Sequence, residues 1–159
     1  MIAPPVKRVD APSTEPPAHF DLDAEAAVLS AVILDPLALD TVKDLLRPEH
    51  FYSEAHRRIH EVCVDLSAEG RPIDVVLVAS RLRENGRLAQ VGGMAYLTAV
   101  LNAAPAVIER HLRAYCEAVG RHARTRKLIA RFERAALELR RGEDVDAVLA
   151  AVARDVEAA

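Results

Sequence analysis

The stretch from Ala106 to Arg141 contains no proline and a single glycine, Gly120. Because proline and glycine are the residues that most often end helices, this stretch predicts one continuous helix about 54 Å long, at about 1.5 Å per residue. Gly142 then predicts a tight turn, and a second amphipathic helix follows it. A long helix, a turn and a second helix together form a helical hairpin.

Both predicted helices of the hairpin carry apolar residues at helical spacing. The first carries Ile108, Leu112, Tyr115, Val119, Leu128, Ile129, Phe132, Ala135, Ala136 and Leu139, and the second carries Val145, Val148, Leu149, Val152 and Val156. Two helices cannot bury both apolar stripes by themselves. We therefore expect residues 106–159 to need a partner surface, of which the simplest is a second copy of the chain.

Residues 19–105 contain the start and stop signals of several shorter helices. Asp21, Ser53 and Asp74 stand where helix N-caps are expected, and Pro48 and Gly70 stand where helices end. Hydrophobic residues make up 51% of the chain and aromatic residues only 4%, a mixture that favours helices over sheets. We therefore predict an all-α fold, with a compact bundle of about five or six helices followed by the long helical hairpin.

Residues 1–18 hold five of the nine prolines. Such a segment cannot form a helix and has little to bury, so we predict a disordered, proline-rich tail. A ligand for a proline-binding domain is the alternative interpretation of these prolines.

Charge is distributed unevenly along the chain, although its net value is only −3. Residues 108–141 contain ten basic and four acidic residues, whereas residues 142–159 contain one basic and five acidic residues. Cys63 and Cys116 are the only cysteines, which is too few for a disulfide framework. With no signal peptide and no membrane-spanning stretch in the sequence, we expect a cytoplasmic protein without a membrane partner.

Four segments of the first part of the chain, together with positions of the long helix, carry a family resemblance. They are D-L-D-A-E-A-A-V-L-S at 21–30, F-Y-S-E-A-H-R-R-I at 51–59, G-R-P-I-D at 70–74, G-R-L-A-Q-V-G-G-M-A-Y-L at 86–97, and Tyr115, Val119, Arg126, Leu128 and Ile129 in the long helix. In this order and spacing they resemble the N-terminal domain of DnaB-type replicative DNA helicases over roughly residues 20–157. We expect Phe51, Tyr52, His56, Ile59, Gly92, Gly93 and Tyr96 among the matched residues to be structural.

A few positions depart from the family pattern. Leu77 stands where the family usually has threonine, and His111-Leu112 replace the usual Asn-Ile. Pro105 comes two residues early, Gly120 interrupts the long helix, and Arg124 replaces an apolar residue. Most of these departures lie at the start of the hairpin, so its partner surface is where this chain is expected to differ from the family.

The resemblance implies a scaffold role in DNA replication. Helicases of this type form rings of six subunits, and their N-terminal domains pair through the hairpins into a collar that docks the C-terminal domain of a DnaG-type primase. By this resemblance the chain would form a dimer, or a hexamer as a trimer of dimers in the full-length protein. The candidates for self-association or primase docking are Ile108, Leu112, Tyr115, Val119, Leu128, Ile129, Phe132, Leu139, Val148 and Val152.

The sequence predicts no catalytic residue, cofactor site or metal site in this chain. The phosphate-binding pattern G-x-x-x-x-G-K-[ST] is absent, so ATP and Mg²⁺ are expected only in the family's separate motor domain. His56 and His60 lie four residues apart, as in some zinc sites, but Arg57 stands where a metalloprotease has its glutamate. We expect His56 to be packed or to contact the helix start, and His60 to be exposed. Gly92-Gly93 predict a tight helix entry rather than a phosphate loop.

Basic residues of the long helix leave a second interpretation open. Candidates for nucleic-acid contact are Arg121, Arg124, Arg126, Lys127 and Arg131. The same charges could instead pair within the helix, as Arg134 with Glu138, or meet an acidic face such as residues 143–157 of a neighbouring hairpin. The alternatives to a collar domain are therefore a nucleic-acid-binding helical protein and a stand-alone regulator of helicase assembly, from a chromosomal, plasmid or phage replicon.

Overall fold

The computed structural model describes residues 19–103 and 109–158. Within them it contains seven α-helices and one 3₁₀ helix and no strand, which confirms the all-α prediction. The elements are α1 (Leu22–Leu34), α2 (Ala38–Leu45), η1 (Pro48–His50), α3 (Glu54–Ala68), α4 (Val75–Glu84), α5 (Gly93–Leu101), α6 (Glu109–Arg140) and α7 (Val145–Glu157). The predicted tail at 1–18, Pro105 and Ile108 lie outside the described residues.

Helix starts follow the predicted caps. Asp21 Oδ1 accepts a hydrogen bond from the Ala24 N–H at 2.8 Å, and Ser53 Oγ accepts one from the His56 N–H at 3.3 Å. Asp74 Oδ1 accepts from two backbone N–H groups of α4, at 2.8 and 2.9 Å. Each cap satisfies donors that the first turn of a helix leaves without an intrahelical partner.

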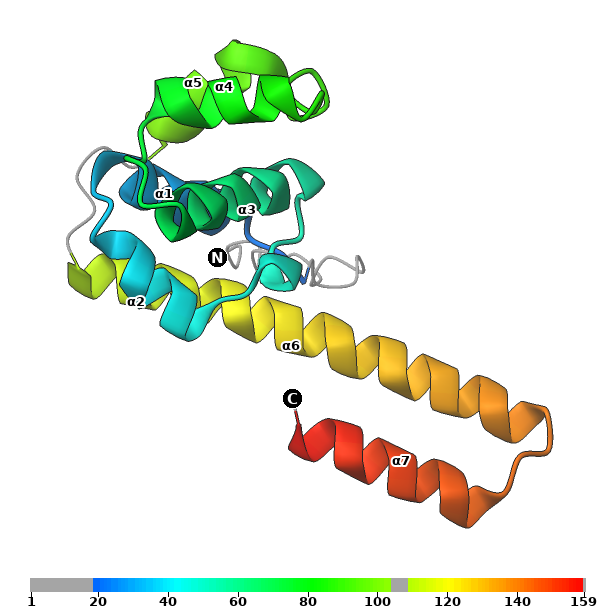
Figure 1. The fold of residues 1–159 in the computed structure, drawn as a ribbon. Helices are drawn as coiled ribbons and strands as arrows, with labels where there is room; N and C mark the ends of the chain where they lie inside the picture. Colours follow the sequence, from blue (N-terminus) through cyan, green and yellow to red (C-terminus); the bar gives the residue numbers. More distant parts are fainter. Residues whose placement is uncertain (1–18, 104–108, 159) are drawn as a thin grey trace, which may run out of the picture.

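Helix α1 forms the centre of the bundle. It packs against α2, α3, α5 and α6, and nine of its thirteen residues are buried. Its apolar residues are not confined to one stripe, as expected for a helix covered on most sides. Figure 1 shows α1, α2 and α3 on the side of the first half of α6, with α4 and α5 beyond them, while the second half of α6 projects away with α7 alongside.

The first half of α6 belongs to the bundle core. Leu112, Cys116 and Val119 are 3%, 1% and 2% exposed and join the same apolar cluster as the residues of α1 and α3. This corrects the prediction that Leu112 and Val119 present a surface to a partner, because α1 and α2 of their own subunit cover this half of the helix. The prediction of a bundle followed by a long hairpin is confirmed, but α6 is shared by both parts.

The helix entry at Gly92 has the close approach expected from the glycine pair. Gly92 has φ +92°, and a Cβ added to it would lie 2.8 Å from Tyr96 Cβ. An L-residue with a side chain would be strained in this conformation and would also clash with the tyrosine. The glycine therefore lets the Tyr96 side chain pack against the backbone at the start of α5.

Candidate interaction surface

A buried hydrogen-bond network holds the bundle behind the candidate surfaces. Glu25 is 1% exposed, and its carboxylate accepts from the backbone N–H groups of Tyr52 and Ser53 at 2.6 and 3.2 Å. His56 Nδ1 lies 2.8 Å from Glu25 Oε2, and His56 Nε2 lies 2.8 Å from the Tyr96 hydroxyl oxygen. Since a carboxylate can only accept, Nδ1 of His56 donates to Glu25. This network joins α1, α3 and α5, which agrees with the structural role expected for His56 and Tyr96.

His60 is buried, not exposed as expected from the sequence. Its side chain is 1% exposed and its ring centroid lies 5.0 Å from that of Phe51. Neither ring nitrogen has a hydrogen-bond partner among the described residues. Burial lowers the pKa of His60 to about 4, and the charge of His50 acts in the same direction. The expectation was wrong because the fourth residue after His56 faces the core of the bundle and not the solvent.

The described residues offer little for metal or thiol chemistry. They contain no group of three or more His, Cys, Asp or Glu side chains that could hold a metal ion. Cys63 and Cys116 are both free and buried, and burial raises the pKa of each thiol to about 12. Thiols with such high pKa values are poor nucleophiles. In the part of the chain that is described, no helix is long and apolar enough to cross a membrane.

The hairpin helices α6 and α7 pack through small and charged residues. Ala135 and Val148 are buried at 7% and 4% exposure. Arg131, which is 11% exposed, lies 3.2 Å from Glu138 and 2.8 Å from Asp155, so it joins the two helices by ion pairs. Arg134 pairs with Glu138 at 2.9 Å, as predicted from their spacing. Arg131 is therefore used inside the hairpin, which contradicts its assignment as a nucleic-acid contact.

One face of the hairpin exposes large apolar side chains. We call it the apolar hairpin face: Ile129 (38% exposed), Phe132 (54%) and Leu139 (41%) on α6, with Val145 (57%), Leu149 (57%) and Val156 (45%) on α7. These residues share a side by helix geometry. Phe132, Leu149 and Val156 directly follow Arg131, Val148 and Asp155, which lie at the α6–α7 contact, and Leu139 lies about two helical turns after Phe132. Each residue of an α-helix is rotated by about 100° about the helix axis from the residue before it. In two antiparallel helices that face each other, the residues that follow the contact positions therefore point to the same side of the hairpin.

The predicted self-association residues fall into three groups. Ile129, Phe132 and Leu139 lie on the apolar hairpin face, and Tyr115, Leu128 and Val152 are half-buried. Val148, like Leu112 and Val119, is buried within its own subunit, because it fills the contact between α7 and α6. The structure thus brings together the residues of the second half of α6 and separates them from those of the first half.

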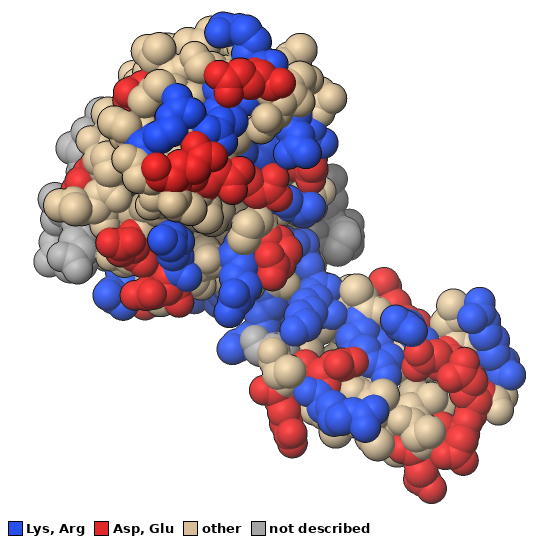
Figure 2. Space-filling model, viewed as in Figure 1, with Lys and Arg blue, Asp and Glu red and all other residues tan. Residues whose placement is uncertain are grey.

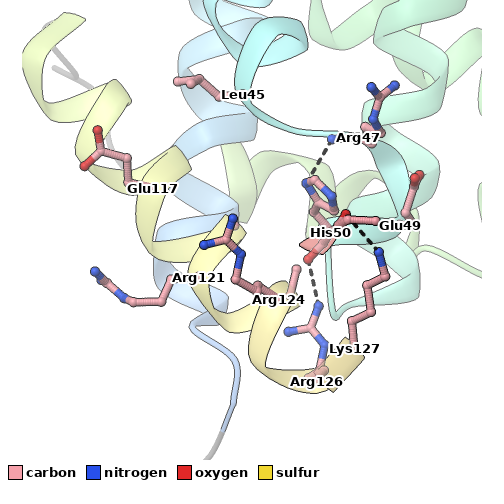
Figure 3. A pocket seen from close by; sticks show the side chains of 12 residues that line it. Leu45, Arg47, Glu49, His50, Glu117, Arg121, Arg124, Arg126 and Lys127 are labelled. Carbon is pink, nitrogen blue, oxygen red and sulfur yellow. Dashed lines mark hydrogen bonds between the residues drawn. The ribbon is translucent and has the colours of Figure 1, made fainter. Parts of the chain in front are cut away.

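Basic side chains gather where the hairpin leaves the bundle, as the blue surface in Figure 2 shows. There a cleft of about 940 Å³ lies between α6 and the segment that joins α2 to α3. Its lining includes Arg47, Glu49 and His50 from that segment and Glu117, Arg121, Arg124, Arg126 and Lys127 from α6. Figure 3 shows these side chains on the two sides of the cleft. We call it the neck cleft.

Arg126 of the neck cleft is engaged with its own chain. Its guanidinium donates to the carbonyl oxygens of His19 at 2.7 Å and His50 at 2.8 Å. It also lies 5.4 Å from the centroid of the Tyr52 ring. Arg126 therefore fixes the N-terminal segment and η1 onto α6, a structural role that its assignment as a nucleic-acid contact did not foresee.

Comparison with known proteins identifies the domain. The family model for the DnaB-like helicase N-terminal domain matches residues 17–121. This chain belongs to that family. The match spans the bundle and the first half of α6, and the resemblance predicted from the sequence motifs is thereby confirmed.

Similar replicative helicases are much longer than this DnaB-type domain. The replicative DNA helicase DnaB of Treponema pallidum is 40% identical over 107 residues, which is 66% of this chain and 24% of that protein. The replicative DNA helicase DnaC of Bacillus subtilis is 39% identical over 85 residues, or 54% of this chain and 19% of that protein. The chain spans about a quarter or less of the length of these relatives.

Solved structures extend the likeness into the hairpin. The crystal structure of the N-terminal domain of DnaB helicase from Mycobacterium tuberculosis is 30% identical, with a TM-score of 0.79 over 86% of this chain and 96% of that one. A DnaB-like replicative helicase, described together with its interactions with primase, is 26% identical with a TM-score of 0.71 over 87% of this chain and 31% of that one. The DnaB-type fold therefore includes most of the chain.

Proposed function

We propose that this chain acts as the N-terminal collar of a hexameric replicative DNA helicase, pairing with a second copy through the hairpin and docking a DnaG-type primase during DNA replication. The observation that carries this proposal is the apolar hairpin face. Six large apolar side chains, each between 38% and 57% exposed, lie on one side of two helices that project from the bundle. Burying such a face against another protein is favourable.

A second copy is the partner that suits this face best. In a two-fold pair the same patch meets itself, and two helical hairpins packed face to face form a four-helix arrangement. The charge pattern supports this choice, because residues 108–141 carry ten basic and four acidic residues while residues 142–159 carry one basic and five acidic residues. In such a pair α6 of one copy lies near the acidic α7 of the other.

Two leucines of α6 provide a matched test of the pairing. Leu139 lies on the apolar hairpin face and is 41% exposed, whereas Leu137, two residues away and on the opposite side, is 45% exposed. We expect Leu139→Glu to convert the pair into a monomer in light scattering at high micromolar concentration, and Leu137→Glu to leave the mass of the pair unchanged. If the two variants had the same mass in light scattering, the apolar hairpin face would not be the pairing surface.

Primase docking needs its own experiment. The support for it is family membership and the DnaB-like helicase described with its interactions with primase. Titration calorimetry of this chain with the C-terminal domain of the cognate primase should give a saturable heat, and the two proteins should comigrate on gel filtration. No heat and no comigration would refute the docking. Under this proposal ATP and Mg²⁺ act in a motor segment, since the P-loop pattern is absent from this sequence.

A stand-alone regulator of helicase assembly would use the same face against a subunit of a full-length ring. The two roles differ in one measurement. A regulator added to assembled rings would lower the hexamer fraction in native mass spectrometry, whereas a collar domain supplied as a separate chain would pair with itself and leave the rings intact.

A further inference from the structure

The neck cleft carries more positive than negative charge. Among the described residues, five cationic side chains line it (Arg47, Arg121, Arg124, Arg126 and Lys127), against two carboxylates (Glu49 and Glu117). The whole chain has a net charge of −3, so this surplus is local. Because like charges gathered in one concave site repel each other, an anion bound there would be stabilised.

Most of these cations are not occupied by internal ion pairs. Arg47 and Arg121 are exposed, and neither side chain forms a salt bridge or hydrogen bond with the residues that the structure describes. The contact of Lys127 is a long one, 3.4 Å from Nζ to the carbonyl oxygen of Ala158. Burial lowers the pKa of His50, and the charges of Arg47, Arg126 and Lys127 lower it further against the opposing effect of Glu49. The interior of the cleft is thus a positive environment.

A pair of exposed aromatic rings lies next to the cleft. Phe20 and Tyr52 stack with centroids 4.4 Å apart and an angle of 11° between their planes, and they are 37% and 50% exposed. Arg126 connects the two features, because it lines the cleft and also lies 5.4 Å from the Tyr52 ring centroid. A basic groove beside exposed aromatic rings is the arrangement that binds single-stranded nucleic acid, whereas an acidic peptide has no need of the rings.

We propose that the neck cleft binds the phosphates of a single-stranded DNA, with Arg47, Arg121 and Lys127 as the phosphate contacts and the Phe20–Tyr52 pair stacking against a base. Guanidinium groups suit phosphate oxygens because they can donate two parallel hydrogen bonds. The choice of DNA as the polyanion rests on the proposed function in DNA replication. The cleft and the apolar hairpin face have no residue in common, so the two surfaces can be disabled separately.

Fluorescence anisotropy with a labelled oligothymidylate of about ten nucleotides tests the site. Three phosphate contacts predict that the affinity falls about 20-fold between about 50 and about 200 mM salt. Arg121→Glu and Arg47→Glu should each weaken binding by about fivefold or more and make the salt dependence shallower. The matched control is Arg83→Glu, the same charge reversal at an exposed arginine of α4, which should bind as the unmodified chain does.

Competition distinguishes the possible ligands. Tyr52→Ala should weaken the binding of the oligonucleotide several-fold, because a stacking ring is lost. The affinity of the cleft for pyrophosphate, measured by displacement of the oligonucleotide, should stay unchanged. A hexaglutamate peptide that competes as well as unlabelled oligothymidylate would overturn the proposal in favour of an acidic protein partner. Absence of binding at low salt, or equal loss in Arg121→Glu and Arg83→Glu, would overturn it altogether.

Binding of the oligonucleotide by the neck cleft and pairing through the apolar hairpin face can be tested separately. Leu139→Glu alters the apolar hairpin face and leaves the cleft intact, so it should bind the oligonucleotide as a monomer. An Arg121→Glu variant that still pairs but has lost the oligonucleotide supports the cleft independently of the collar. Thermal unfolding of each variant by circular dichroism verifies that the measured losses occur in folded protein.

Discussion

The carboxylate of Glu25 connects parts of the chain that are far apart in sequence. It accepts from the N–H groups of Tyr52 and Ser53 and contacts the His56 ring, all within 3.2 Å. Glu25→Ala leaves the buried His56 ring and the two part-buried N–H groups without this partner, and we expect it to reduce the free energy of unfolding by about 3 kcal/mol. Asp23→Ala removes an exposed acidic residue from the same first turn and should cost less than about 1 kcal/mol. Urea denaturation measures both, and similar losses would contradict the network.

His60 makes the stability of the bundle depend on pH. Its pKa in the folded chain is about 4, below the ordinary 6.5, so between these values the unfolded chain binds a proton that the folded chain does not. Stability therefore falls as the pH is lowered through this window, by about 3 kcal/mol in total. His60→Leu should show a flatter dependence of the free energy of unfolding on pH. Parallel curves for the variant and the unmodified chain would show that His60 is not the source.

The sequence predicted residues whose partners are local and missed those whose partners are distant. Asp21, Ser53 and Asp74 cap helices within three residues of themselves, so the residue type and its position sufficed. Nothing in the sequence around Glu25 indicates its role, because its partners lie 27 to 31 positions away. His60 was wrongly expected to be exposed, since nothing local indicates that Phe51 packs on its ring.

Helix α6 runs without interruption through Gly120. A Cβ added at this glycine would meet Leu46 Cδ2 at 3.7 Å, which is ordinary van der Waals contact. We therefore expect Gly120→Ala to raise the free energy of unfolding by up to about 1 kcal/mol, because alanine is the better helix former. Gly92→Ala should instead lower it by about 1–3 kcal/mol, given the positive φ and the clash with Tyr96. Chemical denaturation of the two variants measures both changes, and a loss of stability in Gly120→Ala would mean that α6 bends there.

The apolar spacing of α6 did not reveal which of its residues are covered by their own subunit. Periodicity placed Leu112, Val119, Ile129 and Phe132 on one predicted stripe and assigned all of them to a partner. The first two are buried by α1 and α2 of the same subunit, whereas Ile129 and Phe132 are 38% and 54% exposed. Spacing shows which residues of a helix are apolar but not which half of the helix its own bundle covers. That information comes only from the packing of the helices in three dimensions.

In the whole molecule, two surfaces lie along the same helix and differ in chemistry. The neck cleft is cationic and lies where α6 leaves the bundle, and the apolar hairpin face lies on the projecting half of α6 and on α7. Family membership and the all-α fold followed from motifs spread over the chain, and the need for a partner followed from the apolar hairpin. The neck cleft could not be predicted in full, because Arg47 and His50 come from a segment distant in sequence from the basic helix.

In the proposed pair the hairpin of one copy covers that of another. Sedimentation equilibrium of the unmodified chain at high micromolar concentration measures this pairing as a mass, without a label or a surface. The chain has a mass of 17.4 kDa, and we expect a species of twice that mass which dissociates on dilution. A strictly monomeric species of 17.4 kDa throughout the concentration range would contradict it.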